Sequence, residues 1–363
     1  MRRPTRALVA AAAGLGGAVL GAVAGRQAIR RSRARGSAER DEPMSERPGL
    51  ERRVGSFDGT QLSVNAVGPE AAPTVLFAHG FSLDMTGWYF QWRRFSERYR
   101  CVLYDQRGHG RSGAPVEGDF SVQALGRDLK AVLDAEVPDG PAVLIGHSMG
   151  GIAIMSLAEQ FPDVFGTRVS AVVLTNTAAG EVLKEALAGL GVRLGAILAG
   201  GAARIAGNPR AVARIRGRAF SGESNLAYVI GRLTNFGADA SPALVEHVVG
   251  IAARTPPEVW SDVLVSLVEM DLRHALEHIR VPALVLAGDV DRLTPPAGAL
   301  AIKRALPDAR MVVFRASGHC TMLERHEQWN DVVLAFVEEV FSRTSRARSG
   351  SRHAARRGAV AAS

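Results

Sequence analysis

Ser148, Asp291 and His319 are the three residues of this chain whose types and order suit nucleophilic acyl transfer. Ser148 lies at the centre of residues 146–150, Gly-His-Ser-Met-Gly, which have the form G-x-S-x-G. A serine hydroxyl is a weak nucleophile at its own pKa and needs a histidine as general base. An acid must in turn orient the imidazole and stabilise the imidazolium. The sequence therefore predicts Ser148 as nucleophile, His319 as base and Asp291 as the acid.

Short apolar runs that predict buried strands come before all three residues. The runs are 142–145 before Ser148, 281–287 before Asp291 and 312–314 before His319. Parallel strands place their carboxyl ends at one edge of a sheet, where ligands of open α/β folds bind. A helical pattern begins after Ser148, and the glycines on both sides permit the sharp strand-to-helix turn that exposes a nucleophile. We therefore expect the three side chains to meet at that edge.

Two more segments make residues 52 to 342 resemble capped serine esterases and lipases of the α/β-hydrolase fold. Residues 79–81, His-Gly-Phe, resemble the oxyanion loop of that family, in which the residue after the glycine donates its backbone N–H. Residues 104–112, Tyr-Asp-Gln-Arg-Gly-His-Gly-Arg-Ser, resemble the D-x-R-G-x-G-x-S segment, which is structural in most members. The resemblance implies an oxyanion hole formed by the backbone N–H groups of Phe81 and Met149, with no metal and no cofactor.

The resemblance also implies an α/β fold with a mostly parallel sheet, helices on both faces and a helical cap inserted after the sixth strand. About a hundred residues separate the strand at 171–174 from the one at 281–287, far more than a crossover requires. Apolar residues at helical spacing from Leu183 to Leu198 predict a cap helix that also walls an apolar acyl pocket. The expected divisions are 1–31, a basic and apolar anchor or signal; 32–51, a polar linker; 52–180 and 273–342, the core; 181–272, the cap; and 343–363, a basic disordered tail.

These features predict a serine hydrolase that cleaves carboxylic esters with an apolar acyl group through an acyl-enzyme. A thioesterase, a carbon–carbon bond hydrolase and a cofactor-free perhydrolase are alternatives on the same triad. Dehalogenases and epoxide hydrolases of this fold use an aspartate nucleophile, so Ser148 argues against both. The alternative from another class is a catalytically silent binding protein with the hydrolase fold, which an intact triad disfavours.

Several other polar residues have a structural interpretation beside the functional one. Asp289 is an alternative acid. The family resemblance favours Asp291, and Asp289 is more typical of a turn that hydrogen-bonds within itself. Cys320 is interpreted as a small buried residue next to His319 and not as a redox centre. Packing or solvated roles are expected for four histidines: His147, His326, and the pair His274 and His278, whose i, i+4 spacing has no third metal ligand nearby.

The positive charge of the chain lies at its two ends. The net charge is +8, yet residues 1–53 carry 12 Arg against 5 acidic residues, and residues 342–363 carry 6 Arg and no acid. The body between them is therefore mildly acidic, which argues against nucleic-acid binding by the domain. The basic ends are expected either to lie near an anionic lipid surface or to stay solvated. Cys101 and Cys320 belong to opposite ends of their strands, so two free thiols are expected.

An uncharged segment, residues 7–25, is just long enough to span a bilayer as a helix, although 13 of its 19 residues are Ala or Gly. The alternative is a secretory signal that is cleaved near Ala24. Six arginines follow between residues 26 and 40, and such charge tends to stay in the cytoplasm. We therefore expect an uncleaved membrane anchor with the catalytic domain on the cytoplasmic side.

Overall fold

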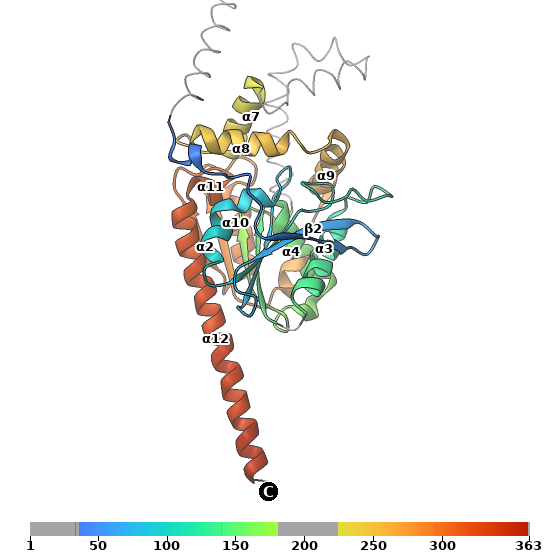
Figure 1. The fold of residues 1–363 in the computed structure, drawn as a ribbon, viewed down its shortest axis with the longest axis vertical. Coiled ribbons are helices and arrows are strands. Elements are labelled where there is room, and N and C mark those ends of the chain that lie inside the picture. Colours follow the sequence, from blue (N-terminus) through green and yellow to red (C-terminus); the bar gives the residue numbers. More distant parts are fainter. Residues whose placement is uncertain (1–32, 34–35, 139, 181–223, 362–363) are drawn as a thin grey trace, which may run out of the picture.

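The computed structural model describes residues 33, 36–138, 140–180 and 224–361. Its centre is an eight-stranded sheet with the strand order β1-β2-β4-β3-β5-β6-β7-β8 (Figure 1). Only β2 pairs antiparallel with its neighbours, β1 and β4, and the other pairs are parallel. The mostly parallel sheet predicted from the sequence is thereby confirmed. The strands are β1 (Leu50–Gly55), β2 (Gln61–Val67), β3 (Thr74–Ala78), β4 (Arg100–Tyr104), β5 (Ala142–His147), β6 (Val169–Thr175), β7 (Ala283–Gly288) and β8 (Arg310–Phe314).

The central strands are apolar on both faces because helices cover both faces. In β3, Val75 and Phe77 belong to one buried cluster, whereas Leu76 and Ala78 belong to the other. This alternation follows from the two-residue period of a strand. The cluster of Leu76 is completed by α3 (Val122–Glu136), α4 (Met149–Gln160) and α10 (Pro296–Ala305), and that of Phe77 by α2 (Tyr89–Phe95), α11 (Thr321–Glu324) and the first half of α12 (His326–Ala361).

The N-terminal side of the domain differs from the expected polar linker. β1 begins at Leu50, and before it Met44, Arg47 and Pro48 already contact the core. Met44 is buried with the cluster of Phe77, and Arg47 forms an ion pair with the buried Asp105. These contacts could not be predicted from the sequence, because a single methionine among charged residues has no periodicity.

In the described part of the connection between β6 and β7, where the cap is expected, three α-helices precede a short 3-10 helix, η4 (His274–His278). The three α-helices are α7 (Asn225–Asn235), α8 (Pro242–Ala252) and α9 (Pro257–Glu269). Ser224 and Ser241 cap α7 and α8, since each side chain accepts a hydrogen bond from the N–H three residues further on. Figure 1 shows α7 and α8 at one end of the molecule, above the sheet, and α9 nearby. The cap helix predicted between Leu183 and Leu198 lies outside the described residues.

The C-terminal region is helical as far as Ala361, although the sequence predicted a disordered tail from residue 343. The first half of α12 packs on the sheet through buried side chains at helical spacing, including Trp329, Val333 and Val337. Figure 1 shows its second half extending away from the domain. Alanine and arginine are strong helix formers, so the helix continues where apolar packing has ended.

Among the helices that the structure describes, none is both long and apolar enough to cross a membrane. The uncharged segment 7–25 lies outside the described residues. Its assignment as an anchor or a signal therefore stays a prediction from the sequence.

Candidate active site

Ser148 occupies a sharp turn between the end of β5 and the start of α4. It has a φ of 51°, in the left-handed region that a serine rarely adopts. The flanking glycines permit this turn: a Cβ on Gly150 would lie 2.0 Å from the carbonyl oxygen of Ala78, and a Cβ on Gly146 would lie 2.5 Å from the backbone of Gly150. Backbone strain is thus held at the one residue whose hydroxyl stands at the N-terminus of α4.

Asp291 and His319 lie at the same edge of the sheet and are hydrogen-bonded to each other. Asp291 follows β7, and His319 follows β8. Nδ1 of His319 donates to Oδ2 of Asp291 over 2.9 Å, and both residues are buried. His147, the residue before Ser148, donates from Nε2 to the carbonyl oxygen of His319 over 3.0 Å. The structure therefore pairs Asp291 with His319 and places the residue before Ser148 against the backbone of His319.

Five donors fix the carboxylate of Asp291. Oδ1 accepts hydrogen bonds from the backbone N–H groups of Leu293 (2.8 Å) and Thr294 (2.9 Å). Oδ2 accepts from the amide of Asn176 (2.8 Å), the hydroxyl of Thr294 (2.7 Å) and His319. Burial raises the pKa of Asp291, but His319 and the hydrogen bonds outweigh burial and leave that pKa below its usual value. Asp291 is therefore ionised at neutral pH.

Asn176 and Thr294 are site residues that the sequence reasoning missed. Asn176 directly follows β6, and its amide also donates to the carbonyl oxygen of Gly318 over 3.1 Å. A polar residue at the end of a buried strand, on the edge shared with Ser148, was the signal that could have identified it. Thr294 offers no such signal because its contact with Asp291 arises within one irregular turn.

The predicted oxyanion loop lies next to Ser148. A Cβ on Gly80 would be 3.2 Å from the Cβ of Ser148 and 2.6 Å from Nδ1 of His147, so the loop approaches the turn closely. Phe81 is the next residue of this loop, and Met149 is the first residue of α4. The N-terminus of a helix presents free N–H groups and a favourable dipole to a negative charge. The arrangement is suited to hold an oxyanion formed on a substrate of Ser148.

The cap supplies apolar side chains above these loops. The ring of Trp260, in α9, lies with its centroid 5.4 Å from that of Phe81. Val259 approaches Gly108, where an added Cβ would be 2.7 Å from the valine side chain. The ring of Phe81 also meets that of His109 edge to face at 6.0 Å. Aromatic and aliphatic groups thus surround the loop that carries the predicted oxyanion donor.

The other polar residues considered from the sequence make structural contacts. Asp289 is exposed, and its carboxylate accepts the N–H of Ser317 over 3.3 Å. Cys101 and Cys320 are both free and buried, which confirms the prediction of two thiols. Within the described residues no cluster of three His, Cys, Asp or Glu side chains is arranged for a metal ion. The ring of His326 stacks on that of Phe90, with 4.0 Å between the ring centroids. Nε2 of His274 lies 2.6 Å from Oε1 of Glu159, and Nε2 of His278 lies 3.7 Å from Oε1 of Glu277.

Comparison with known proteins assigns this architecture to a family. The sequence model of the alpha/beta hydrolase family matches residues 75–332, which is more than half of the chain. The chain belongs to the alpha/beta hydrolase family. The matched range includes Ser148, Asp291 and His319.

Individual relatives agree with that assignment. The chain is 28% identical over 281 residues to 3-oxoadipate enol-lactonase 2 of Acinetobacter baylyi. This match covers 76% of the present chain and 93% of the lactonase. It is also 28% identical over 286 residues to a putative carbamate hydrolase of Caulobacter sp. (strain K31), and this match covers 78% of the present chain and 97% of the relative. Among solved structures, a thermophilic esterase from Thermogutta terrifontis is 23% identical with a TM-score of 0.63, over 80% of this chain and 99% of that one. This alpha/beta hydrolase therefore shares its fold with an esterase, and its sequence resembles those of hydrolytic enzymes.

Proposed function

We propose that this protein is a serine hydrolase of carboxylic esters, cyclic esters included, and that it works through an acyl-enzyme. The observation that carries the proposal is the 2.9 Å hydrogen bond from His319 to the ionised Asp291, beside the turn that holds Ser148. With its proton fixed on Nδ1, the imidazole keeps a lone pair on Nε2 that is available for the serine proton.

The proposed reaction has two acyl-transfer steps. Oγ of Ser148 attacks the ester carbonyl while Nε2 of His319 takes its proton, and the N–H groups of Phe81 and Met149 stabilise the oxyanion. The C–O bond then breaks, and His319 returns the proton to the departing alcohol. Water, deprotonated by His319, attacks the acyl-serine; the bond between the acyl carbon and Oγ of Ser148 breaks, His319 returns the proton to Oγ, and the acid is released. In a lactone the alcohol stays attached, so the product is a single hydroxy acid.

Two observations support the substrate class. The contact between Trp260 and Phe81 gives the site an apolar wall, which favours esters with an apolar acyl group. The similarity to an enol-lactonase along 93% of that relative supports including lactones, since opening a lactone is the same acyl transfer.

A substrate panel with the Ser148→Ala variant tests the proposal. The panel consists of p-nitrophenyl esters of increasing acyl length, matching thioesters and an aliphatic lactone. The wild-type protein should hydrolyse the esters faster than the thioesters, and the variant should lose roughly 10⁴-fold or more of kcat while its thermal unfolding is unchanged. A folded wild-type protein without turnover on any of these substrates would favour the binding-protein alternative.

We also propose, from the sequence alone, that residues 7–25 attach the enzyme to a membrane with its catalytic domain on the cytoplasmic side. The segment has bilayer length and carries no charge, and six arginines follow it closely.

A further inference from the structure

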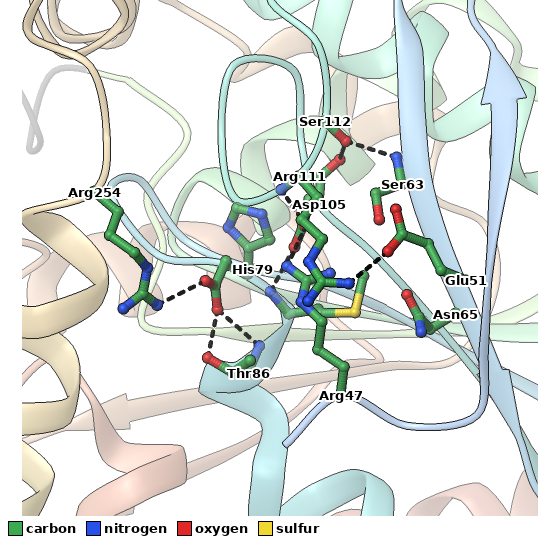
Figure 2. Close-up of polar contacts among 12 residues, drawn as sticks. Arg47, Glu51, Ser63, Asn65, His79, Thr86, Asp105, Arg111, Ser112 and Arg254 are labelled. Atoms are coloured by element: carbon green, nitrogen blue, oxygen red, sulfur yellow. Dashed lines mark hydrogen bonds and ion pairs between the residues drawn. The ribbon is translucent and has the colours of Figure 1, made fainter. Parts of the chain in front are cut away.

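Asp105 is a fully buried carboxylate close to the predicted oxyanion loop (Figure 2). Its Oδ1 accepts the backbone N–H of Met85 over 2.8 Å, and its Oδ2 accepts the backbone N–H of Arg111, also over 2.8 Å. A Cβ on Gly110 would lie 2.2 Å from Oδ2, so the backbone packs directly against the carboxylate. The negative charge of Asp105 is therefore held in one place.

Asp105 and its neighbour Gln106 bind the chain on both sides of Phe81. Asp105 binds Met85, four residues after Phe81. At the near end the N–H of Gln106 donates to Nε2 of His79 over 2.9 Å. Burial lowers the pKa of His79 to about 4, so this ring is neutral and its nitrogen accepts the bond. Phe81 lies between these two attachments along the chain.

The cation that pairs with Asp105 comes from the N-terminal side of the domain. Nη2 of Arg47 donates to Oδ2 of Asp105 over 2.6 Å, and the arginine side chain is only 12% exposed. The guanidinium of Arg111 is directed elsewhere, to Glu51 at 2.7 Å. Asp84 is a second negative charge near Asp105 and disfavours its ionisation.

The remaining titratable groups near Asp105 do not replace Arg47. Burial lowers the pKa values of His79 and His109 to about 4, so both rings are neutral at pH 7. Asp84 has its own cation, Arg254 of the cap, at 3.1 Å (Figure 2). Burial raises the pKa of Asp105; Arg47 opposes that rise without cancelling it, so the pKa stays above its usual value.

The segment that carries Arg47 connects the cap to the core, and we call residues 36–48 the strap. Just before it, Arg33 pairs with Glu246 of α8 at 2.8 Å. At its other end the carbonyl oxygen of Pro48 accepts the side-chain amide of Asn65 over 2.8 Å. Figure 1 shows this segment passing beside α8 and then reaching the sheet. Arg47 is therefore presented to Asp105 by a segment held at both ends.

We propose that Arg47 is a positioning residue for the oxyanion loop: by neutralising Asp105 it keeps the carboxylate, and with it Met85 and Phe81, in the catalytic arrangement. The inference rests on the proposed function because it assigns the N–H of Phe81 to the oxyanion. Without Arg47 the carboxylate keeps its two backbone N–H donors but loses the cation that pairs with it, and a buried charge without a counter-charge is strongly unfavourable. The carboxyl group of Asp105 then has two alternatives. It takes up a proton, which faces the backbone N–H of Arg111, or it stays ionised and shifts as water enters beside it.

The test compares three variants in the full-length protein: Arg47→Met, Arg47→Lys, and Arg47→Met combined with Asp105→Asn. In Arg47→Met we expect kcat to fall roughly tenfold at pH 8 with little change in KM, less than the 10²–10³-fold loss of a deleted oxyanion donor. The ratio of its activity to that of wild type should fall as the pH rises, because the unpaired carboxyl ionises above its raised pKa. Arg47→Lys should keep most of the activity, and the double variant should show a ratio independent of pH.

Arg94→Met is the matched control, since Arg94 forms an exposed ion pair with Glu97; it should behave as wild type. A pH-independent loss in Arg47→Met, or none, would overturn the proposal. If the wild-type protein hydrolyses no ester, the proposed function fails, and thermal unfolding then decides the role of Arg47. The Tm deficit of Arg47→Met should grow from pH 5.5 to pH 8 and lose its pH dependence in the double variant; a constant deficit would exclude the pairing.

Discussion

Replacing Asp291 by asparagine should reverse the role of His319. The N–H groups of Leu293 and Thr294 both donate to Oδ1 of Asp291, so the amide oxygen of the asparagine must take that position. Its NH₂ group then faces Nδ1 of His319, which has to accept a hydrogen bond instead of donating one. The imidazole proton consequently moves to Nε2, the atom that must receive the proton of Ser148.

The expected loss is large because the histidine is then a donor where catalysis needs a base. We expect kcat to fall about 10⁴-fold, as when a triad aspartate becomes asparagine and the geometry is kept. This factor corresponds to about 5.4 kcal/mol of activation free energy. KM should change little, because the proposed mechanism gives Asp291 no contact with the substrate. Steady-state hydrolysis of a p-nitrophenyl ester measures both constants, and thermal unfolding shows whether the variant is folded.

Asp289→Asn is the matched control, two residues away. Asp289 is exposed, and its contact with the N–H of Ser317 is long at 3.3 Å. Its replacement should change kcat by no more than about twofold, the scale of an ordinary surface substitution. Asp291 is not the acid if Asp291→Asn retains more than about a tenth of the wild-type kcat. The same conclusion follows if Asp289→Asn loses more of its kcat than Asp291→Asn does.

Burial lowers the pKa values of His79 and His109 to about 4 and that of His147 to about 3, whereas histidines of the unfolded chain titrate near ~6.5. The unfolded state therefore binds more protons below pH 6.5, and Tm should fall from pH 7 to pH 5; a constant Tm would contradict this reasoning. Gly150→Ala should lower soluble yield and activity together, since its Cβ would lie 2.0 Å from a β3 carbonyl oxygen; a stable, fully active variant would refute the turn geometry. Residues 7–25 should keep full-length protein in the membrane pellet after carbonate extraction, and recovery in the supernatant would argue against an anchor.

The sheet, and the shared edge at which Ser148, Asp291 and His319 follow their strands, were accessible from the sequence for a physical reason. Strands buried on both faces have continuous apolar sequences, and the residues that follow parallel strands lie at the same edge of the sheet. The choice between Asp289 and Asp291 was different, because both lie in the same turn and only the family resemblance favoured the second. The contacts of Asp291 with Asn176 and His319 supply the physical distinction.

The strap and the C-terminal helix could not be predicted in the same way. Arg47 and Asp105 are 58 residues apart, and a single ion pair leaves no periodic pattern. Met44 likewise stands alone among polar residues. In residues 343–361 the lack of apolar positions suggested disorder, yet helix propensity alone favours continuing α12. Hydrophobic patterning predicts neither the tertiary contacts of isolated residues nor helices that lack a packed face.

Whether Ser148 is an activated nucleophile can be measured by mass spectrometry of the protein after treatment with a fluorophosphonate, which reacts covalently with a base-activated serine. We expect a single adduct, located on the peptide that contains Ser148. It should be absent in Ser148→Ala and should form far more slowly in His319→Ala. A folded wild-type protein that forms no adduct, or an adduct that persists in Ser148→Ala, would contradict the assignment of Ser148 as an activated nucleophile.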